Sequence, residues 1–207
     1  LLIAEKDWLS NNNLNGRIEE IIEAETADLK RISQLKTPPP VLAVFKKANH
    51  SQTEKPYLSH LCLALDEIQD PGNVGTILRI ADWFGIETVY CSKGCADVYN
   101  PKTIQATMGA IARIKVIEVN LVDFLTQLPK EIPIYGSSLT GEIIYIEPLS
   151  KNGIIIMGNE GNGISKKIEQ LLTKRLYIPN FPIDRKCSDS LNVATATAII
   201  CSEFRRR

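Results

Sequence analysis

The sequence has no net charge, since its 24 lysine and arginine residues balance 24 aspartate and glutamate residues. Net charge therefore gives no indication of a polyanionic partner, and any nucleic acid would have to bind to local basic groups. The sequence also lacks an apolar run near the roughly 20 residues that span a bilayer. We expect neither a membrane anchor nor a secretory signal, and hence a protein that does not bind membranes.

Cysteine and histidine are scarce. The five cysteines at positions 62, 91, 95, 187 and 201 form no C-x-x-C pair, and their odd number argues against a disulfide framework. Scattered thiols of this kind are usually small core residues in a reducing compartment, so we expect a cytoplasmic location. The two histidines give no metal-ligand spacing, and we expect no bound metal. The chain opens LLIAEKDW without a methionine, from which we expect the natural N-terminus to lie upstream.

Two parts of different texture follow one another along the chain. Apolar residues at helical spacing predict a helix over residues 17–35, and three prolines then precede a short strand at residues 41–45. The polar, turn-rich stretch KKANHSQTEKP indicates a linker, which we place at residues 49–57. We therefore expect an N-terminal unit over residues 1–48 and a larger domain over residues 58–207.

Within the larger domain, short apolar strands alternate with helical or polar segments. The expected strands are LCLALDEI, TVYC, RIKVIEV, IPIYGSS, GIIIMG and RLYIP. This alternation predicts an α/β fold with a mostly parallel sheet and helices on both faces. Ligands of such sheets bind outside the carboxyl ends of the strands, so the binding site is expected in the segments that follow them.

The first such segment, LDEIQDPGNVGTILRIADWFG, spans residues 65–85. Its DPGN turn predicts a helix with Asn73 as the N-cap, and apolar residues at helical spacing give that helix a buried face. Gly72, Gly75 and Arg79 fall on another face, where two glycines would leave room for a bulky group beside a guanidinium. The alternative is an ordinary capped helix with a solvated arginine.

The second segment, MGNEGNGIS at residues 157–165, differs at one position from the phosphate-binding pattern G-x-x-x-x-G-K-[ST]. Ile164 stands where the lysine belongs, and Glu160 adds a carboxylate that would repel a triphosphate. Glycine-rich loops present backbone N–H groups to a ligand, and we expect a short helix from about Ser165. The sequence argues against an ATPase, while a simple turn that caps the helix stays open as an alternative.

The third segment spans residues 175–204, where a strand leaves through Pro179 into an irregular loop. The stretch SDSLN then opens a helix, for which Ser190 is the expected N-cap. Alanines and threonines make this helix narrow, so it can pack very close to a neighbour. Capping alone is the alternative explanation for the pair Ser190 and Asn192.

Together these segments resemble the three motifs of the SpoU/TrmH family of S-adenosylmethionine-dependent RNA ribose methyltransferases, within the SPOUT superfamily. The matching pieces are N-x-G-x-x-x-R (Asn73, Gly75 and Arg79), GNEGNGIS (residues 158–165) and IP…SLNV (Ile178 and Pro179, then Ser190 to Val193). The stretch NPKTIQATMGA is similar to a further family segment, with Gln105 and Thr107 at its usual Arg and Ser. All four pieces fall in the family's order.

The resemblance implies a fold and a chemistry. Members of the family form a deep trefoil knot in their C-terminal third, bind S-adenosylmethionine there in a bent conformation, and act as homodimers. Many carry a small RNA-binding α/β domain before the knot, and residues 1–48 resemble its tail. The cofactor carries no phosphate, which explains a phosphate-type loop without its lysine. Methyl transfer to a ribose 2′-hydroxyl is an in-line displacement that depends on alignment and needs no metal.

The same resemblance assigns roles to individual residues. Those that would position the reacting groups are Asn73, Arg79, Glu160, Ser190 and Asn192. Those that would bind the cofactor, largely through backbone, are Leu139, Met157, Gly158, Asn159, Gly161, Ile178, Asn180 and Leu191, with residues 159–161 closing over it. The family's proposed base is the arginine, here Arg79. A guanidinium resists deprotonation, so holding the target phosphate and polarising the hydroxyl is an equally good role.

Two features of the sequence bear on the choice of RNA substrate. The loop from Pro179 to Ser190 is longer than the family's usual spacing and Asn180 replaces a methionine, so the rim of the cofactor pocket is expected to differ. We expect ribosomal rather than transfer RNA, bound by basic groups at Lys46, Lys47, Lys166, Lys167, Arg185, Lys186 and the arginines 205–207. Two alternatives stay open, namely a non-catalytic RNA-binding relative and a methyltransferase that acts on a base.

Overall fold

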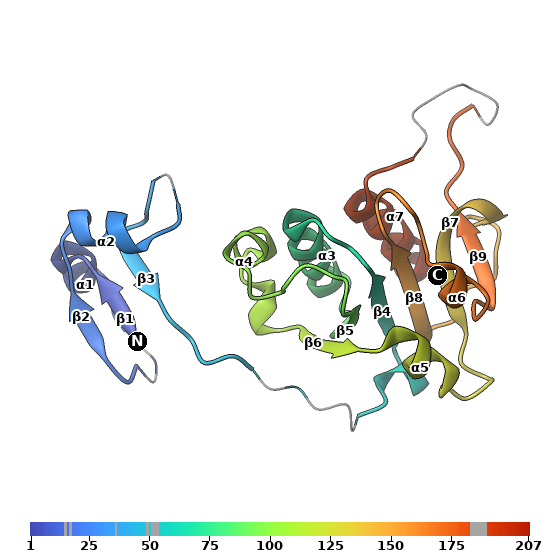
Figure 1. Ribbon diagram of the computed structural model, residues 1–207, viewed down its shortest axis with the longest axis horizontal. Helices are drawn as coiled ribbons and strands as arrows, with labels where there is room; N and C mark the ends of the chain where they lie inside the picture. The colour runs from blue at the N-terminus through green and yellow to red at the C-terminus, as the bar shows by residue number, and fades with distance from the viewer. Residues whose placement is uncertain (15, 17, 36, 49, 51–53, 183–189) are drawn as a thin grey trace. The chain divides into compact units, whose positions relative to one another are not determined.

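The computed structural model describes residues 1–14, 16, 18–35, 37–48, 50, 54–182 and 190–207 (Figure 1). The chain divides into two compact units, Leu1–Asn49 and His50–Arg207. Each unit has its own sheet.

The first unit is a three-stranded sheet in the order β2-β1-β3 with two short helices. Its elements are β1 (Leu2–Ala4), α1 (Lys6–Asn11), β2 (Ile21–Glu23), α2 (Thr26–Ile32) and β3 (Val41–Ala43). The expected single helix over residues 17–35 is wrong, because β2 pairs in parallel with β1 and only α2 is helical. Tertiary strand pairing of two β-branched isoleucines has overridden their helical spacing. The strand expected at residues 41–45 is confirmed as β3, which pairs antiparallel with β1.

The second unit is built on a six-stranded sheet in which every pairing is parallel. The strands are β4 (Leu61–Asp66), β5 (Thr88–Ser92), β6 (Lys115–Val119), β7 (Ile134–Ile143), β8 (Gly153–Gly158) and β9 (Lys174–Tyr177). All six strands expected from the sequence are confirmed, and so is the parallel α/β architecture. The order across the sheet is β6-β5-β4-β8-β7-β9, so the direction in which the chain adds strands reverses between β4 and β8 (Figure 1).

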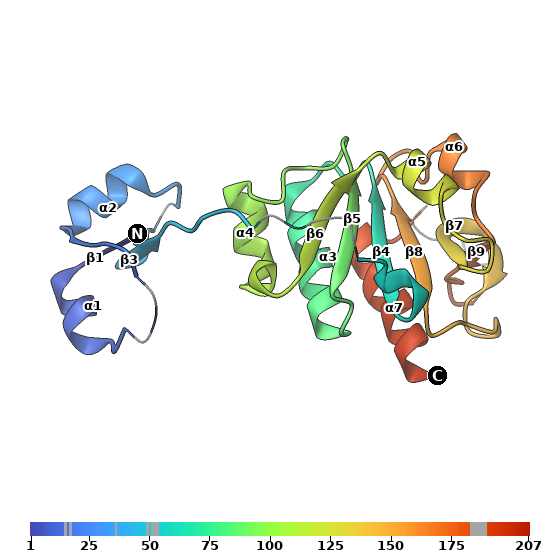
Figure 2. The same ribbon diagram turned by 90° about the horizontal axis from the view of Figure 1, so that it is seen from below.

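Alternation along the central strands creates a core on each face of this sheet. In β4, Leu61, Leu63 and Leu65 join one buried cluster, whereas Cys62 and Ala64 join the other. The first cluster is covered by α3 (Pro71–Trp83) and α7 (Val193–Arg206), and the second by α5 (Leu121–Thr126) and α6 (Lys166–Glu169). Figure 2 shows α3 beside α7 and α5 beside α6. The remaining helices are α4 (Pro101–Thr107), which packs against α3, and two 3₁₀ turns, η1 (Pro56–Leu58) and η2 (Ala110–Ala112).

The C-terminal helix α7 is tied to the end of α3 by Arg205. Its Nε donates to Phe84 O at 2.7 Å, and its Nη2 donates to Gly85 O at 2.9 Å. A cation on the last carbonyls of a helix satisfies acceptors that have no partner within the helix and complements the helix dipole. This contact fixes α7 beside α3. The expected trefoil knot depends on the path between β9 and α7, part of which (residues 183–189) lies outside the described residues. None of the described helices is long and apolar enough to cross a membrane.

Candidate active site at the carboxyl edge of the sheet

The reversal of strand order brings β4 and β8 side by side, with Asp66 paired to Gly158 at their carboxyl ends. Ligands of open parallel sheets bind at such a switch point. The loop of residues 159–165 leaves β8 here, and the turn into α3 leaves β4 beside it. Because all six strands are parallel, the residues that follow β7 and β9 lie at the same edge. The topology thus gathers all three motif segments at one edge.

Helix α3 begins differently from the expectation. Its N-cap is Asp70, whose Oδ1 accepts a hydrogen bond from the backbone N–H of Asn73 at 2.8 Å, and Pro71 occupies the first helical position. The assignment of Asn73 as N-cap is therefore wrong. Since Asp70 satisfies the backbone donor, the Asn73 side chain is available for contacts with other segments.

Three motif residues, one from each segment, form a single hydrogen-bonded chain. Asn73 Nδ2 donates to Glu160 Oε1 at 3.0 Å, and Asn192 Nδ2 donates to Asn73 Oδ1 at 2.9 Å. A carboxylate only accepts, so Glu160 fixes which end of the Asn73 amide faces it, and Asn73 in turn fixes Asn192. This cluster (Asn73, Glu160 and Asn192) joins α3, the loop after β8 and the start of α7.

Asn192 also begins helix α7. Its Oδ1 accepts from the backbone N–H of Ala194 at 2.9 Å and of Thr195 at 3.3 Å, which makes Asn192, and not Ser190, the N-cap. The amide suits both roles because its oxygen caps the helix while its nitrogen reaches Asn73. Ser190 lies exposed two residues earlier, and the cap of α7 is formed by Asn192.

The glycines of the second motif have different structural roles. A Cβ at Gly158 would lie 2.3 Å from Ile164 N, so this position must be glycine for the loop to fold back on itself. Gly163 has a φ of +70°, a left-handed conformation that glycine adopts without penalty. A Cβ at Gly161 would meet only Asn159 Oδ1 at an ordinary 3.6 Å. Gly161 therefore has no packing reason to be glycine, and the space beside its exposed backbone is open to a ligand.

The structure corrects the reading of the glycine face on α3. A Cβ at Gly75 would lie 2.4 Å from Thr103 O and 2.6 Å from Ala106 Cβ, so Gly75 permits close packing of α4 and leaves no room for a ligand. Arg79 is exposed and makes no hydrogen bond or ion pair with any described residue. Six helical residues separate it from Asn73, which places it about 9 Å further along the axis and about 120° around it. Within one protomer Arg79 therefore stands apart from the cluster.

The residues expected to bind the cofactor lie along the carboxyl edge with unequal exposure. The side chain of Met157 is only 1% exposed in the core, so it can offer a ligand only backbone atoms. Leu139, in the irregular stretch of β7, is 63% exposed and Leu191 is 48% exposed. Gly158, Asn159, Ile178 and Asn180 are partly buried. The roles assigned to these residues stay predictions.

Sequence reasoning missed the acidic residues at the end of β4. Asp66 is 3% exposed and its Oδ2 accepts from Ser165 N at 2.7 Å, while Glu67 O accepts from Asn159 Nδ2 at 2.7 Å. A charged residue that closes the otherwise apolar run LCLALD was the available signal, because a buried carboxylate needs a partner.

Several of the basic groups expected to bind RNA have partners within the protein. Arg205 caps α3, and Arg206 and Arg207 bind Glu203. The three C-terminal arginines, which were expected to bind RNA, thus have partners within the protein. Lys46 pairs with Glu19 at 2.7 Å. Lys166 and Lys167 are exposed at the start of α6, next to the loop. Arg185 and Lys186 lie outside the described residues.

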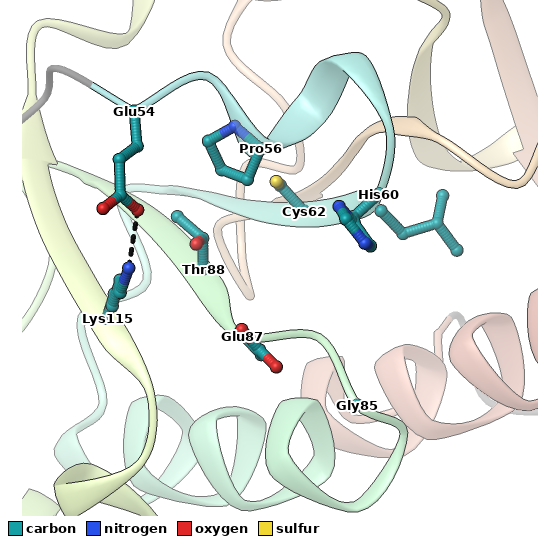
Figure 3. Close-up of a pocket in the computed structure, with 9 residues that line it drawn as sticks. Glu54, Pro56, His60, Cys62, Gly85, Glu87, Thr88 and Lys115 are labelled. Atoms are coloured by element: carbon teal, nitrogen blue, oxygen red, sulfur yellow. Dashed lines mark hydrogen bonds and ion pairs between the residues drawn. The ribbon is translucent and has the colours of Figure 1, made fainter.

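A small cavity lies at the other edge of the sheet. It measures about 90 Å³ and is lined by residues at the amino ends of β4, β5 and β6, including Cys62, Thr88 and Lys115 (Figure 3). The ion pair of Lys115 with Glu54, at 2.6 Å, lies in its wall. Because it contains none of the motif residues, the cavity is not the candidate active site.

Comparisons with known proteins give a consistent picture. The sequence model of the SpoU rRNA Methylase family matches residues 60–202. The 23S rRNA (guanosine(2553)-2′-O)-methyltransferase RlmP of Bacillus subtilis is 34% identical, with 84% of this chain and 68% of that protein covered. The mitochondrial rRNA methyltransferase 3 of Mus musculus is 27% identical, with 90% of this chain but only 57% of that protein covered.

Two solved structures agree in fold over nearly the whole chain. A Porphyromonas gingivalis protein described as an RNA methyltransferase of the TrmH family has a TM-score of 0.84 and 43% identity, and the match covers 99% of this chain and 81% of that one. An rRNA methyltransferase of Sinorhizobium meliloti with bound AdoMet has a TM-score of 0.83 and 26% identity, with 99% and 78% covered.

Proposed function

The chain belongs to the SpoU rRNA methylase family, and we propose that it transfers a methyl group from S-adenosylmethionine to a ribose 2′-hydroxyl of ribosomal RNA. The observation that carries this proposal is the cluster of Asn73, Glu160 and Asn192 at the switch point of the sheet. Three segments distant in sequence meet there through hydrogen bonds between their side chains. The rRNA substrates named for the relatives support ribosomal over transfer RNA.

The carboxyl edge suits a cofactor with an apolar body and no phosphate. The exposed backbone at Gly161 leaves space where any other residue would place a Cβ, and the loop carries no cation that a phosphate would require. The exposed leucines 139 and 191 offer apolar surface for an adenine or a methylene chain. Residues 158–161 and 178–180 would hold the cofactor, which supplies an electrophilic methyl group on a sulfonium.

The residues of the chain would act by alignment and electrostatics. The 2′-oxygen would form a bond to the methyl carbon as the carbon–sulfur bond breaks, the sulfonium would leave as a neutral thioether, and the hydroxyl proton would pass to solvent water. Arg79 has no partner among the described residues, so its planar guanidinium is available to hold the target phosphate and polarise the hydroxyl. The cluster keeps the glycine loop in place during the displacement. Alignment of this kind can supply several kcal/mol, of the order of 7–11, of the barrier reduction.

A homodimer would place Arg79 of one protomer within reach of the cluster of its partner. Arg79 lies on an outward stripe of α3 with Trp83, which is 84% exposed, and with the partly exposed Ile80. The outward face of α7, beside α3, carries Thr195 and Ile199. We propose that these stripes pack at a two-fold axis, so that Arg79 of one protomer serves the cluster of its partner. Light scattering should give twice the 23.0 kDa of one chain, and Trp83→Lys should give a monomer.

The first unit and the exposed lysines 166 and 167 would contribute to RNA binding. The buried free cysteines 62, 91 and 201 support a cytoplasmic location. The proposed function is tested by calorimetric titration with S-adenosylmethionine and by transfer of labelled methyl to purified ribosomal and transfer RNA. Saturable one-site binding and label in ribosomal RNA are expected. No binding, with no label in either RNA, would rule the proposal out.

A further inference from the structure

The loop of residues 159–165 is tied to the end of β4 at both of its own ends. At the N-terminal end, Asn159 Nδ2 donates to Glu67 O at 2.7 Å. At the C-terminal end, Ser165 N donates to Asp66 Oδ2 at 2.7 Å. The two anchors are consecutive residues of the chain, so a single point of the sheet fixes the beginning and the end of the loop.

Contacts inside the loop fix its shape between these anchors. Asn159 Oδ1 accepts from the backbone N–H groups of Gly161 and Asn162, both at 3.0 Å. Asn159 and Gly163 exchange backbone hydrogen bonds of 3.0 Å and 2.9 Å across the loop. The amide of Asn159 thus bonds at both ends within the protein, with its nitrogen on the sheet and its oxygen on the loop. Its side chain organises the loop.

The anchors themselves are held firmly. Asp66 is 3% exposed, and a buried carboxylate that accepts a backbone N–H makes a stronger bond than a neutral acceptor would. Glu67 has a φ of +55°, a left-handed conformation that is uncommon for a residue other than glycine. Its N–H donates to Ser92 Oγ at 2.9 Å, and its carbonyl accepts from Asn159. The left-handed turn aims that carbonyl at the loop.

We infer that Asp66 and Asn159 are positioning residues that hold the loop in its binding shape before the cofactor arrives. Only the side chain of Glu160 leaves the loop toward α3, where it meets Asn73. The loop is thus preformed, and the cofactor enters it without first having to order it. A ligand that enters a preformed site avoids the entropy cost of ordering a loop. This role rests on the proposed function, because the ligand concerned is S-adenosylmethionine.

Amide hydrogen exchange of the cofactor-free protein tests the preformed loop without any ligand. The amides of Gly161, Asn162 and Ser165 should exchange at least about tenfold more slowly than unprotected amides. Asp66→Ala should remove the protection of Ser165. Unprotected exchange at these three amides in the native protein would overturn the inference, whether or not the protein binds the cofactor.

Calorimetry with S-adenosylmethionine then compares Asp66→Ala with Asn162→Ala. Asn162 lies in the same loop, but its backbone N–H makes its contact with Asn159, so removal of its side chain is the matched control. Loss of a charge-assisted hydrogen bond should raise the dissociation constant by at least about tenfold in Asp66→Ala. Asn162→Ala should change it less than about twofold. Equal dissociation constants for these two variants would overturn the inference, while failure of the native protein to bind would refute the proposed function instead.

Removal of a buried carboxylate can also unfold a protein, so Asp66→Asn provides a second variant. It keeps the shape and one oxygen acceptor for Ser165 N. We expect it to melt near the native temperature and to bind the cofactor more tightly than Asp66→Ala. If Asp66→Asn melts near the native temperature but binds no better than Asp66→Ala, the acceptor is not what holds the loop, and the inference fails.

Discussion

Asn192 follows Asn73 by 119 residues, yet its Nδ2 donates to Asn73 Oδ1 at 2.9 Å. The contact joins the first turn of α3 to the first turn of α7, and the other end of the Asn73 amide binds Glu160. Asn73 therefore has one donor and one acceptor bond whose directions are both fixed. A variant that reverses either direction should be costly.

Asn73→Asp tests this polarity. The new carboxylate would face Glu160, and two carboxylates at hydrogen-bond distance repel each other and raise the pKa of one of them. We expect at least about a tenfold loss of cofactor affinity, since a charged hydrogen bond is replaced by repulsion. In the double variant Asn73→Asp with Glu160→Gln, the glutamine amide can donate to the new carboxylate, so cofactor affinity should return toward the native value. A double variant whose loss equals the sum of the two single losses would show that these side chains are not coupled.

Two glycine variants separate loop folding from ligand access. Gly158→Ala should lower the melting temperature, because its Cβ would clash with the backbone of the returning loop. Gly161→Ala should melt close to the native protein, since its Cβ meets only an ordinary contact, but it should bind S-adenosylmethionine less tightly. Differential scanning fluorimetry and calorimetry measure the two effects. Native cofactor affinity in Gly161→Ala would remove this backbone from the proposed site.

Arg79 variants separate catalysis from cofactor binding. Arg79→Ala should lose nearly all methyl transfer while its cofactor dissociation constant changes by less than about tenfold, or roughly 1.4 kcal/mol. Arg79→Lys should not restore transfer, because a point charge cannot reproduce the planar fork. Single-turnover transfer to ribosomal RNA measures the first effect and calorimetry the second. Substantial turnover by Arg79→Ala would contradict the role assigned to the guanidinium.

The ion pairs of Glu203 predict a pH dependence of stability. Hydrogen bonds from Arg206 and then Arg207 lower the pKa of this carboxyl, whose side chain is only 7% exposed. A group whose pKa is lowered by folding stabilises the native state above its unfolded pKa, about 4.3 for glutamate. That contribution is lost as the pH falls through the lower folded pKa. Urea unfolding should therefore show Glu203→Gln less stable than the native protein at pH 7, with the difference shrinking below about pH 4.

Glu169→Gln is the control for this pH effect. Glu169 also pairs with an arginine, Arg175, at 3.1 Å, but its side chain is 38% exposed. Exposed ion pairs contribute little to the free energy of unfolding, so Glu169→Gln should change stability little at any pH between 7 and 3. A difference between Glu203→Gln and the native protein that stays constant from pH 7 to pH 3 would show that the carboxyl does not titrate as described.

The strands of the second unit could be predicted from the sequence, whereas the helix caps could not. Short continuous apolar runs such as LCLALD and GIIIM, separated by helical or polar segments, are typical of buried parallel strands, and all six strands are confirmed. The N-caps of α3 and α7 were wrongly predicted because several residues at the start of each helix can accept hydrogen bonds from the same backbone N–H groups. Only the tertiary contacts of Asn73 and Asn192 decide which residue is the cap. Helical spacing in the first unit failed for the same reason, since pairing with β1 is a long-range contact that no local pattern contains.

The residues of the candidate site were likewise predicted only in part. The family resemblance identified Asn73, Glu160 and Asn192, which the fold brings together. The sequence could not show that α4 fills the space beside Gly75, because the contact with Thr103 comes from a separate segment. Asp66 was missed although it ends an apolar run, because its role depends on a backbone N–H that lies 99 residues further along the chain.

Nucleoside analysis of methylated RNA tests the central claim most directly. The native protein, S-adenosylmethionine carrying a labelled methyl group and unmodified ribosomal RNA are incubated together, and the product is hydrolysed in alkali. A methyl group on the ribose 2′-oxygen removes the nucleophile that alkali needs, so the label should appear in an alkali-resistant dinucleotide. The account predicts this dinucleotide, and its absence in Arg79→Ala. Label in a methylated base, or no label from a protein that binds the cofactor, would contradict the account.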